Sequence, residues 1–310
     1  MPQTNDTQSI VVVGLGDIAQ KAWLPLICQH PDISPIFCTR NPDTLSRLAK
    51  QYRVSHCYQD YQQALATAPD AVMIHSATSS HFALASQAIS LGIATFVDKP
   101  LADNFMQCQQ LAALAKAHNV PLFTGFNRRY APLLQPLKAQ PLQQLQWQKH
   151  RHDLVGNVRD FIFDDFIHVI DSLLHYSHTQ SMPDLSISYR MQQDSLAQVQ
   201  IQWQQGGMQV SGVMNRTAGH TFERVEAFAH NQYWQLDNLR QGFHSQENRL
   251  QPIGFDDWQP TLTKRGFNAL LADWLNQVKH AQYQPKQLDS MLLSHQVAEL
   301  LVQHIESHNI

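Results

Sequence analysis

Short apolar runs alternate with helical patterns over the first 125 residues. The runs are rich in β-branched and aromatic residues, as buried parallel strands are; they lie at residues 10–13, 36–38, 71–74, 94–97 and 121–125. Between them, apolar residues recur every three or four positions, as in Phe82, Ala85 and Ile89, which is typical of helices with one buried face. Strands alternating with helices predict an α/β domain with a doubly wound parallel sheet over residues 1–125.

The pattern changes near residue 140. After a helical segment around residues 163–175, apolar and polar residues alternate with a period of two over 185–191, 197–203 and 208–214. The polar positions are rich in Gln, and Gly206-Gly207 fits a hairpin turn. Such alternation indicates an antiparallel sheet with one buried face. We expect an α+β domain over residues 126–310 with a large, mostly antiparallel sheet.

Two amphipathic patterns finish the chain, at residues 267–278 and 292–305. Their apolar residues recur at helical spacing. We expect two helices there, which are able to pack back on the first domain.

The turn after the first strand has the pattern Gly-x-Gly-x-x-Ala, from Gly14 to Ala19. Gly14 allows a tight turn, Gly16 lets the backbone approach a pyrophosphate, and Ala19 permits close packing of helix on strand. Free N–H groups at the helix start, with Asp17 and Ile18 in the first turn, would face the phosphates. Between a strand and a helix this pattern predicts a dinucleotide-binding Rossmann domain; a plain glycine turn is the alternative.

The second strand ends at Cys38-Thr39-Arg40-Asn41. A site that prefers NAD usually has an acidic residue here for the ribose 2′-hydroxyl, and none is present. Arg40 could pair with a 2′-phosphate, and Thr39 could donate a hydrogen bond. We therefore favour NADP(H) as the cofactor, with NAD(H) as the alternative if Arg40 is only a solvated surface charge.

Asp98-Lys99-Pro100 follows the apolar run at residues 94–97. Ligands bind at the carboxyl ends of strands in such sheets, and Pro100 keeps the preceding residues extended. A lysine there can act as a general acid if its surroundings lower its pKa. The position alone leaves an ordinary surface lysine equally open.

With these motifs the chain resembles the Gfo/Idh/MocA family of NAD(P)-dependent oxidoreductases. The family has the glycine motif, a Glu-Lys-Pro that corresponds to Asp98-Lys99-Pro100, and an Asp-x-x-x-His helix that corresponds to Asp164 and His168. The resemblance spans both expected domains. It is strongest to the MviM branch, through residues 16–25, 97–102, 125–129 and 149–151.

The resemblance implies three catalytic residues. Lys99 would hydrogen-bond the reacting hydroxyl or carbonyl, His168 would transfer the proton, and Asp164 would orient the substrate or the imidazole. The spacing of Asp164 and His168 predicts that they share one helix face. An imidazole suits proton transfer near neutral pH.

The resemblance also places the two ligands. It implies cofactor contacts in the loops after the later strands, at Ser76, Ala77, His81, Asp98 and Lys99. It implies substrate contacts at Asn127, Arg128, Arg129, His150 and Arg151. The alternative for His150 and Arg151 is a solvated strand end. The alternative for residues 127–129 is the start of a surface helix.

The implied function is reversible hydride transfer between NAD(P) and a hydroxyl or carbonyl of a sugar-like or cyclitol-like small molecule. A non-catalytic NADP(H)-binding sensor or regulatory protein is the alternative. Departures from the family pattern bear on the substrate. Asp98 replaces the usual Glu, Ala77-Thr78 replaces Thr-Pro, and the usual glycines before Asp164 are absent. By analogy with the family we expect a homodimer or homotetramer.

Charge and composition narrow the class of protein. The 310 residues carry a formal net charge of −3 at pH 7, without the basic stripe of nucleic-acid-binding proteins. The chain has no run of about 18 apolar residues, which is the length that a membrane helix needs. Its first nine residues are polar and do not resemble a signal peptide. Cys28, Cys38, Cys57 and Cys108 have neither zinc nor disulfide spacing. We expect reduced thiols, a cytoplasmic protein and no metal site.

Overall fold

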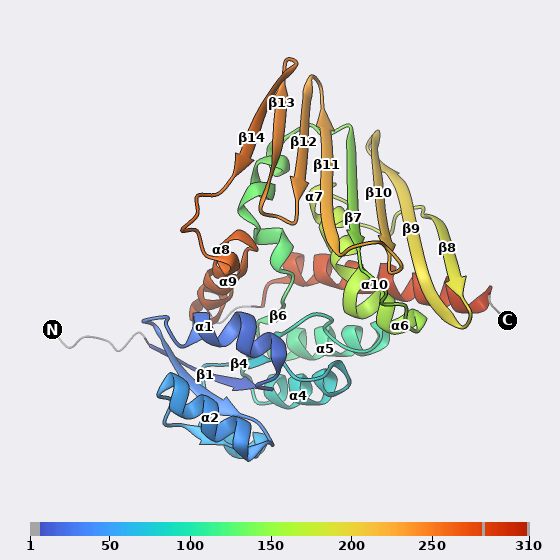
Figure 1. Cartoon of the computed structure of the whole chain (residues 1–310). Coiled ribbons are helices and arrows are strands. Elements are labelled where there is room, and N and C mark those ends of the chain that lie inside the picture. Colours follow the sequence, from blue (N-terminus) through green and yellow to red (C-terminus); the bar gives the residue numbers. More distant parts are fainter. Residues whose placement is uncertain (1–6, 281–282, 309–310) are drawn as a thin grey trace. The chain divides into compact units, whose positions relative to one another are not determined.

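A computed structural model of the chain describes residues 7–280 and 283–308. It divides into two compact units (Figure 1). The first unit combines the residues up to Gly125 with Leu270–Leu288. The second combines Phe126–Ala269 with the residues from Asp289 onward. No helix in the described ranges is long and apolar enough to cross a membrane.

The first unit contains a parallel sheet of six strands among its described residues, in the order β3-β2-β1-β4-β5-β6. The strands are β1 (Gln8–Val13), β2 (Ile33–Cys38), β3 (Cys57–Tyr58), β4 (Ala71–Ile74), β5 (Ala94–Val97) and β6 (Leu122–Thr124). The central residues of β1 and β4 are fully buried, as their apolar runs require. The strand order reverses between β1 and β4, so the expected doubly wound Rossmann sheet is confirmed.

Helices connect the parallel strands. They are α1 (Leu24–Ile27), α2 (Pro42–Tyr52), α3 (Tyr61–Leu65), α4 (Thr78–Ser90) and α5 (Phe105–His118). Helix α9 (Phe267–His280) lies largely in this unit, where Trp274 packs against Phe96 and Phe123 with ring centroids 5.9 and 5.8 Å apart. Its apolar stripe is therefore buried against the sheet, although it comes from the far end of the sequence.

The helix expected from residue 18 opens with a wide turn, a π-helical segment over Ala19–Trp23. There the N–H of Leu24 donates to the carbonyl of Ala19. Pro25, the next residue, has no N–H to continue the ordinary ladder. The turn before it widens, and α1 begins only at Leu24.

The second unit contains an eight-stranded sheet in the described part of the chain, in the order β14-β13-β12-β11-β7-β10-β9-β8. Its strands are β7 (Gln144–His150), β8 (Ser186–Gln192), β9 (Ser195–Gln205), β10 (Met208–Asn215), β11 (Phe222–Ala229), β12 (Gln232–Asp237), β13 (Gln241–Gln246) and β14 (Arg249–Gly254). Only the β7–β10 pair among them is parallel. The expected large, mostly antiparallel sheet is confirmed, and Gly206 and Gly207 form its hairpin turn with φ of +56° and +87°.

Helical segments accompany this sheet in the second unit. They are η2 (Asn127–Tyr130), η3 (Pro132–Ala139), α6 (Val158–Asp160), η4 (Phe161–Phe166), α7 (Ile167–Tyr176), α8 (Thr261–Lys264) and most of α10 (Pro285–Ser307). Helix α7 among them packs on β7 and β10. It lies close to β10, where Gly212 leaves room for it. A Cβ on Gly212 would lie only 2.7 Å from Val169 and 2.6 Å from Leu173 of the helix. This packing fixes η4 and α7 against the sheet.

Candidate functional site

A cavity of about 500 Å³ lies in the first unit at the carboxyl ends of β1, β2 and β4. Its lining residues are Val13, Gly14, Cys38, Thr39, Arg40, Asn41, Gln59, Asp60, Tyr61, Ser76, Ser80 and Leu84. This is the reversal point of the strand order, where ligands of open α/β sheets bind. The turn predicted to hold a dinucleotide and the residues expected beside its adenosine ribose therefore meet in one cavity.

Gly14 and Gly16 have different physical roles in the turn. Gly14 has a φ of +86°, and a Cβ there would lie 2.5 Å from the backbone nitrogen of Ser76. Only glycine fits, because both the backbone conformation and the neighbouring strand exclude a side chain. A Cβ at Gly16 would meet nothing within 4 Å. The chain itself does not need a glycine at residue 16, whereas a ligand lying against the turn does, so the turn fits a bound pyrophosphate.

The first helical turn beyond these glycines is half open to solvent. Ala19 is fully buried, as close packing of helix on strand requires. Asp17 is exposed and pairs with Lys21 at 2.8 Å, and 43% of Ile18 is exposed. Neither Asp17 nor Ile18 therefore has a buried side chain.

Thr39 and Arg40 line the cavity, and the Arg40 side chain is exposed. Asp60 lines the same cavity, and sequence reasoning missed it. One oxygen of Asp60 accepts a hydrogen bond from the backbone of Gln63 at 2.9 Å and caps α3. The signal was available, since Asp60 follows a short strand and precedes a helix as an N-cap residue does. Both a cation and a carboxylate therefore face the expected ribose.

Ser76 and His81 differ in what they offer a cofactor. The hydroxyls of Ser76 and Ser80 lie 2.7 Å apart at the cavity wall. The ring of His81 is 1% exposed, and its two nitrogens lie 2.8 Å from the carbonyl of Pro100 and 3.0 Å from that of Ser76. Burial lowers the pKa of His81. His81 thus connects the loop after β4 to the loop after β5. Ala77, which follows Ser76, is the N-cap residue of α4.

Asp98 is a buried carboxylate with three contacts inside the first unit. It accepts from the indole N–H of Trp23 at 3.2 Å, from the backbone of Lys99 at 2.9 Å, and lies 3.4 Å from Nδ1 of His75. The His75 ring also stacks on Trp23, with centroids 5.2 Å apart. Burial opposes ionisation, but His75 and Lys99 outweigh it and lower the pKa of Asp98. Trp23 and His75, which sequence reasoning also missed, hold the residue that orients the backbone of Lys99.

Lys99 is half-buried directly after β5 and precedes Pro100 through a cis peptide. In the second unit, Asp164 is exposed in η4 and His168 is half-buried in α7. η4 is a π-helical segment, so the ordinary helix assumed for the spacing of Asp164 and His168 begins only at Ile167. The carbonyl of His168 accepts from Ser172 at 2.6 Å, which fixes this turn of α7.

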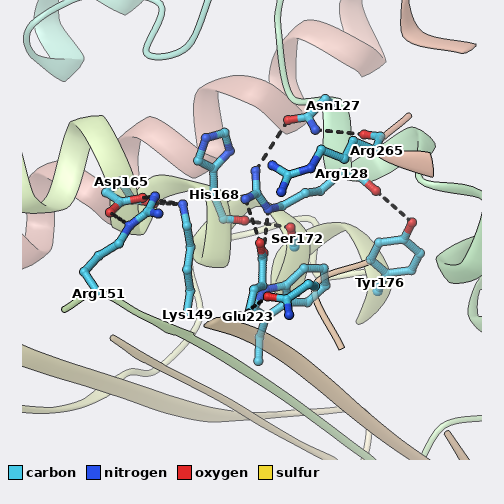
Figure 2. A network of polar contacts seen from close by, with 12 residues as sticks. Asn127, Arg128, Lys149, Arg151, Asp165, His168, Ser172, Tyr176, Glu223 and Arg265 are labelled. Atoms are coloured by element: carbon cyan, nitrogen blue, oxygen red, sulfur yellow. Dashed lines mark hydrogen bonds and ion pairs between the residues drawn. The ribbon is translucent and has the colours of Figure 1, made fainter. Parts of the chain in front are cut away.

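The neighbouring carboxylate, Asp165, is the buried one, and sequence reasoning missed it. It pairs with Lys149, with Arg151 at 2.7 Å and with Arg216 at 3.2 Å. Burial opposes its ionisation, but Lys149 and Arg151 prevail and hold its pKa far below the usual range. Burial and the nearby Arg128 lower the pKa of Lys149 to about 7. Figure 2 shows this group together with His168.

A second polar group surrounds Glu223 (Figure 2). Arg128 donates to both of its oxygens, at 2.6 and 2.9 Å, and the indole of Trp147 donates at 2.9 Å. Asn127 donates to the carbonyl of Arg265 at 2.8 Å. Asn127, Arg128 and Arg151, three of the expected substrate residues, thus lie in one polar region of the second unit.

Arg129 and His150 have structural contacts instead. Arg129 is buried and donates to both oxygens of Asp171, which also accepts from Ser294 at 2.8 Å. Nδ1 of His150 accepts from the backbone of Asn215 at 3.0 Å, and its ring packs against Phe222. Neither arrangement leaves the polar atoms concerned available to a ligand.

The four cysteines in the described ranges are free thiols. Cys38 and Cys108 are buried, and Cys28 and Cys57 are half-buried. Burial raises the pKa of Cys28 to about 12 and that of Cys38 to about 11. These thiols are therefore poor nucleophiles near neutral pH. Among the described residues, no three His, Cys, Asp or Glu side chains are grouped as a metal site would need.

Comparison with known proteins gives matches to both parts of the chain. Residues 8–126 match the family described as "Oxidoreductase family, NAD-binding Rossmann fold", and residues 132–247 match the "YceM-like, C-terminal domain". A curated relative, "Putative oxidoreductase YceM" of Salmonella typhimurium, is 30% identical over 95% of this chain and 97% of its own.

Solved structures extend the likeness to both sheets. A Gfo/Idh/MocA family oxidoreductase from Vibrio cholerae is 41% identical, with a TM-score of 0.93 over 97% of this chain and 99% of its own. A dehydrogenase (MviM) from Clostridium difficile is 23% identical, with a TM-score of 0.89 over 96% and 99%. The expected resemblance, including that to MviM proteins, is confirmed.

Proposed function

Because the chain belongs to the Gfo/Idh/MocA family of oxidoreductases, we propose that it transfers a hydride between NADP(H) and a hydroxyl or carbonyl of a sugar-like or cyclitol-like molecule. The observation that carries this proposal is the cavity at the reversal point of the first sheet. Gly14 of the glycine turn lines this cavity together with Thr39 and Arg40.

The choice of NADP(H) rests on Arg40. A guanidinium beside the ribose can pair with a 2′-phosphate, which NAD lacks. Asp60 in the same cavity opposes that preference by its charge. We propose that Arg40 dominates, because the Asp60 carboxylate already accepts a backbone hydrogen bond at the start of α3.

In the proposed mechanism, a dinucleotide held by the glycine turn, Thr39 and Arg40 would provide the hydride chemistry, and the protein positions the substrate and moves the proton. Lys99 hydrogen-bonds the reacting oxygen and stabilises the charge that develops on it. Its backbone is held by Asp98, which Trp23 and His75 fix in turn. His168 takes or returns the proton of the reacting hydroxyl, and Asp164 orients the substrate or the imidazole.

A sugar-like substrate is supported by a structural neighbour. "UDP-N-acetylglucosamine 3-dehydrogenase GnnA" of Acidithiobacillus ferrooxidans has a TM-score of 0.78 at 19% identity, over 96% of this chain and 99% of its own. At this identity the likeness concerns the fold. We propose that the small-molecule substrate of this chain belongs to the same broad class of polyhydroxylated compounds.

Fluorescence titration with NADPH and with NADH tests the cofactor assignment. We expect wild type to bind NADPH more tightly, and Arg40→Ala to reduce the NADPH/NADH affinity ratio about tenfold, since a charge-assisted pair is lost. Lys50→Ala removes another exposed cation of the same unit and should leave the ratio unchanged. An unchanged ratio in Arg40→Ala contradicts the role of Arg40, and failure of wild type to bind either nucleotide contradicts the proposed function.

Turnover is tested by a screen of polyols and sugars with NADP, followed by single variants. Lys99→Met should abolish turnover and keep NADPH affinity, because it removes the group on the reacting oxygen and leaves the nucleotide cavity intact. His168→Gln should lower the turnover rate and keep NADPH affinity, because it removes the group proposed to transfer the proton. Loss of nucleotide binding in Lys99→Met would show that Lys99 acts on the cofactor instead.

A further inference from the structure

Positive charge gathers on the inner face of the sheet in the second unit. Lys149 of β7 and Glu223 of β11 pair in register. Arg128 approaches from η2, Arg151 follows β7, and Arg265 caps the C-terminal end of α8. The charges influence one another, since Arg128 and Arg151 both act to lower the pKa values of Lys149 and Arg265.

These cations outnumber the carboxylates among them. Within the described residues, five buried or half-buried cationic side chains accompany two such carboxylates, Asp165 and Glu223. The cations are Arg128, Lys149, Arg151, Arg216 and Arg265. Even with Lys149 neutral, the group keeps an excess of positive charge.

The excess is clearest at Arg265. Its guanidinium makes no side-chain hydrogen bond or ion pair with another described residue, and its Nε is shielded from solvent without an acceptor. Burial, and then the Arg128 guanidinium, lower the pKa of Arg265. In Figure 2 the Arg265 side chain lies beside that of Arg128. By contrast, Arg128 already has both oxygens of Glu223.

An uncompensated cation costs free energy when it is withdrawn from water. A buried donor without an acceptor adds to that cost. Groups of this kind are found where a ligand supplies the missing charge, and a guanidinium matches the oxygens of a carboxylate or phosphate. An anion beside Arg265 would supply both the missing negative charge and an acceptor for Nε.

We infer that Arg265 binds an anionic group of the substrate, a carboxylate or a phosphate, and that the neighbouring charges of Arg128 and Lys149 favour that anion. This inference rests on the proposed function and narrows the sugar-like or cyclitol-like substrate to an acidic one. Figure 2 shows His168 between the Asp165 group and the Arg128–Glu223 pair. An anion at Arg265 would anchor one end of the substrate in the unit that holds the proposed proton-transfer residue.

Calorimetric titration of the NADPH-saturated protein tests the inference with three probes of one ring type. The probes are D-glucuronate, D-glucose 6-phosphate and D-glucose, at constant ionic strength. We expect at least one charged sugar to bind about tenfold or more tightly than glucose, which corresponds to one charge-assisted contact. The preferred charged probe distinguishes a carboxylate ligand from a phosphate ligand.

Arg265→Gln should remove this preference, so that charged and neutral sugars bind alike. The variant should fold, because no acceptor loses its partner, and its thermal melt checks this. Arg249→Gln is the matched control, since it removes an exposed arginine from β14 of the same unit. It should keep the preference. A second measurement uses heat. Inorganic phosphate should raise the melting temperature of wild type relative to chloride of equal ionic strength, and Arg265→Gln should not show this rise.

Two results would overturn the inference while leaving the proposed function intact. One is wild type that binds NADPH but shows no preference for either charged sugar. The other is an equal loss of preference in Arg265→Gln and Arg249→Gln, which would mean that only overall charge matters. Failure to bind NADPH would instead contradict the proposed function, and the same sugar titrations without nucleotide would then judge the anion site by itself.

Discussion

Arg129 and Asp171 form an ion pair whose side chains are 6% and 1% exposed. Taking both charges out of water is costly, and the cost is offset only while the pair is complete. Asp171 receives further support from Ser294. The pair therefore holds η2, which carries Arg128, against α7, which carries His168.

Asp171→Asn should lower the free energy of unfolding by about 3 kcal/mol or more, because it leaves the buried Arg129 without its counterion. Urea unfolding at neutral pH measures the loss. Asp237→Asn is the comparison, since it breaks the Arg224–Asp237 pair, whose side chains are 38% and 26% exposed. It should cost less than about 1 kcal/mol. Equal costs for the two variants would show that burial of the first pair does not matter.

From the sequence, a single residue can be placed relative to the strands and helices only where a motif isolates it. Lys99 follows a strand and precedes a proline, so its position could be derived from two neighbours. Asp164 and Asp165 are adjacent, and only the fold shows which one is buried. The acidic Asp60 and the Trp23–His75–Asp98 contacts join residues distant in sequence, which no local pattern reveals.

At the scale of elements, the turn from β1 into the first helix was predicted because each requirement is local. Gly14 supplies a positive φ, and Ala19 supplies a small side chain. The four strands β11 to β14 were not predicted, although residues 222–229 alternate with a period of two. The π-helical segment η4 also escaped prediction, since its apolar spacing resembles that of an ordinary helix.

Gly16→Ala separates the needs of the fold from those of the ligand. The new Cβ would have no protein atom within 4 Å, so the thermal stability of the protein without nucleotide should not change. The methyl group would occupy the space through which the backbone approaches the pyrophosphate. The dissociation constant of NADPH should therefore rise about tenfold or more, a loss of roughly 1.4 kcal/mol.

The control for this change is Gly219→Ala, where a Cβ also meets nothing within 4 Å but the position lies in the other unit. It should alter neither stability nor nucleotide affinity. If Gly16→Ala bound NADPH as wild type does, the phosphates would have to lie elsewhere, and the dinucleotide role of the turn would be wrong.

For the molecule as a whole, the sequence predicts both sheets and allows the last two helices to pack back on the first domain, but it does not predict where the chain passes between the units. Leu270–Leu288 returns to the first unit, and residues from Asp289 onward belong to the second. Periodicity marked the apolar faces of these helices without indicating which core each face joins. The partner of an apolar face is a long-range property, which explains why it became evident only from the structure.

Acid should weaken the whole molecule through its buried carboxylates. Burial alone would oppose ionisation, but Arg128 outweighs it and lowers the pKa of Glu223 from 4.5 to about 2. A carboxyl with a lower pKa in the folded state stabilises the fold above its unfolded pKa, and this contribution is lost as pH falls toward the folded value. Asp165 acts in the same direction. Lys149, with a pKa of about 7, titrates above this window and does not offset the loss.

The free energy of unfolding, measured with urea between about pH 5 and pH 3, should therefore fall in wild type, with roughly 2 kcal/mol of the fall due to Glu223. Glu223→Gln should be less stable than wild type at neutral pH, because Arg128 and Trp147 lose a charged acceptor. Its decline in acid should be shallower, since one titrating group is gone. Asp194→Asn, at an exposed hairpin turn, should follow the wild-type profile. Parallel profiles for Glu223→Gln and wild type would mean that Glu223 has an ordinary pKa in the folded protein, and that the positive charge of this region is weaker than its arginines indicate.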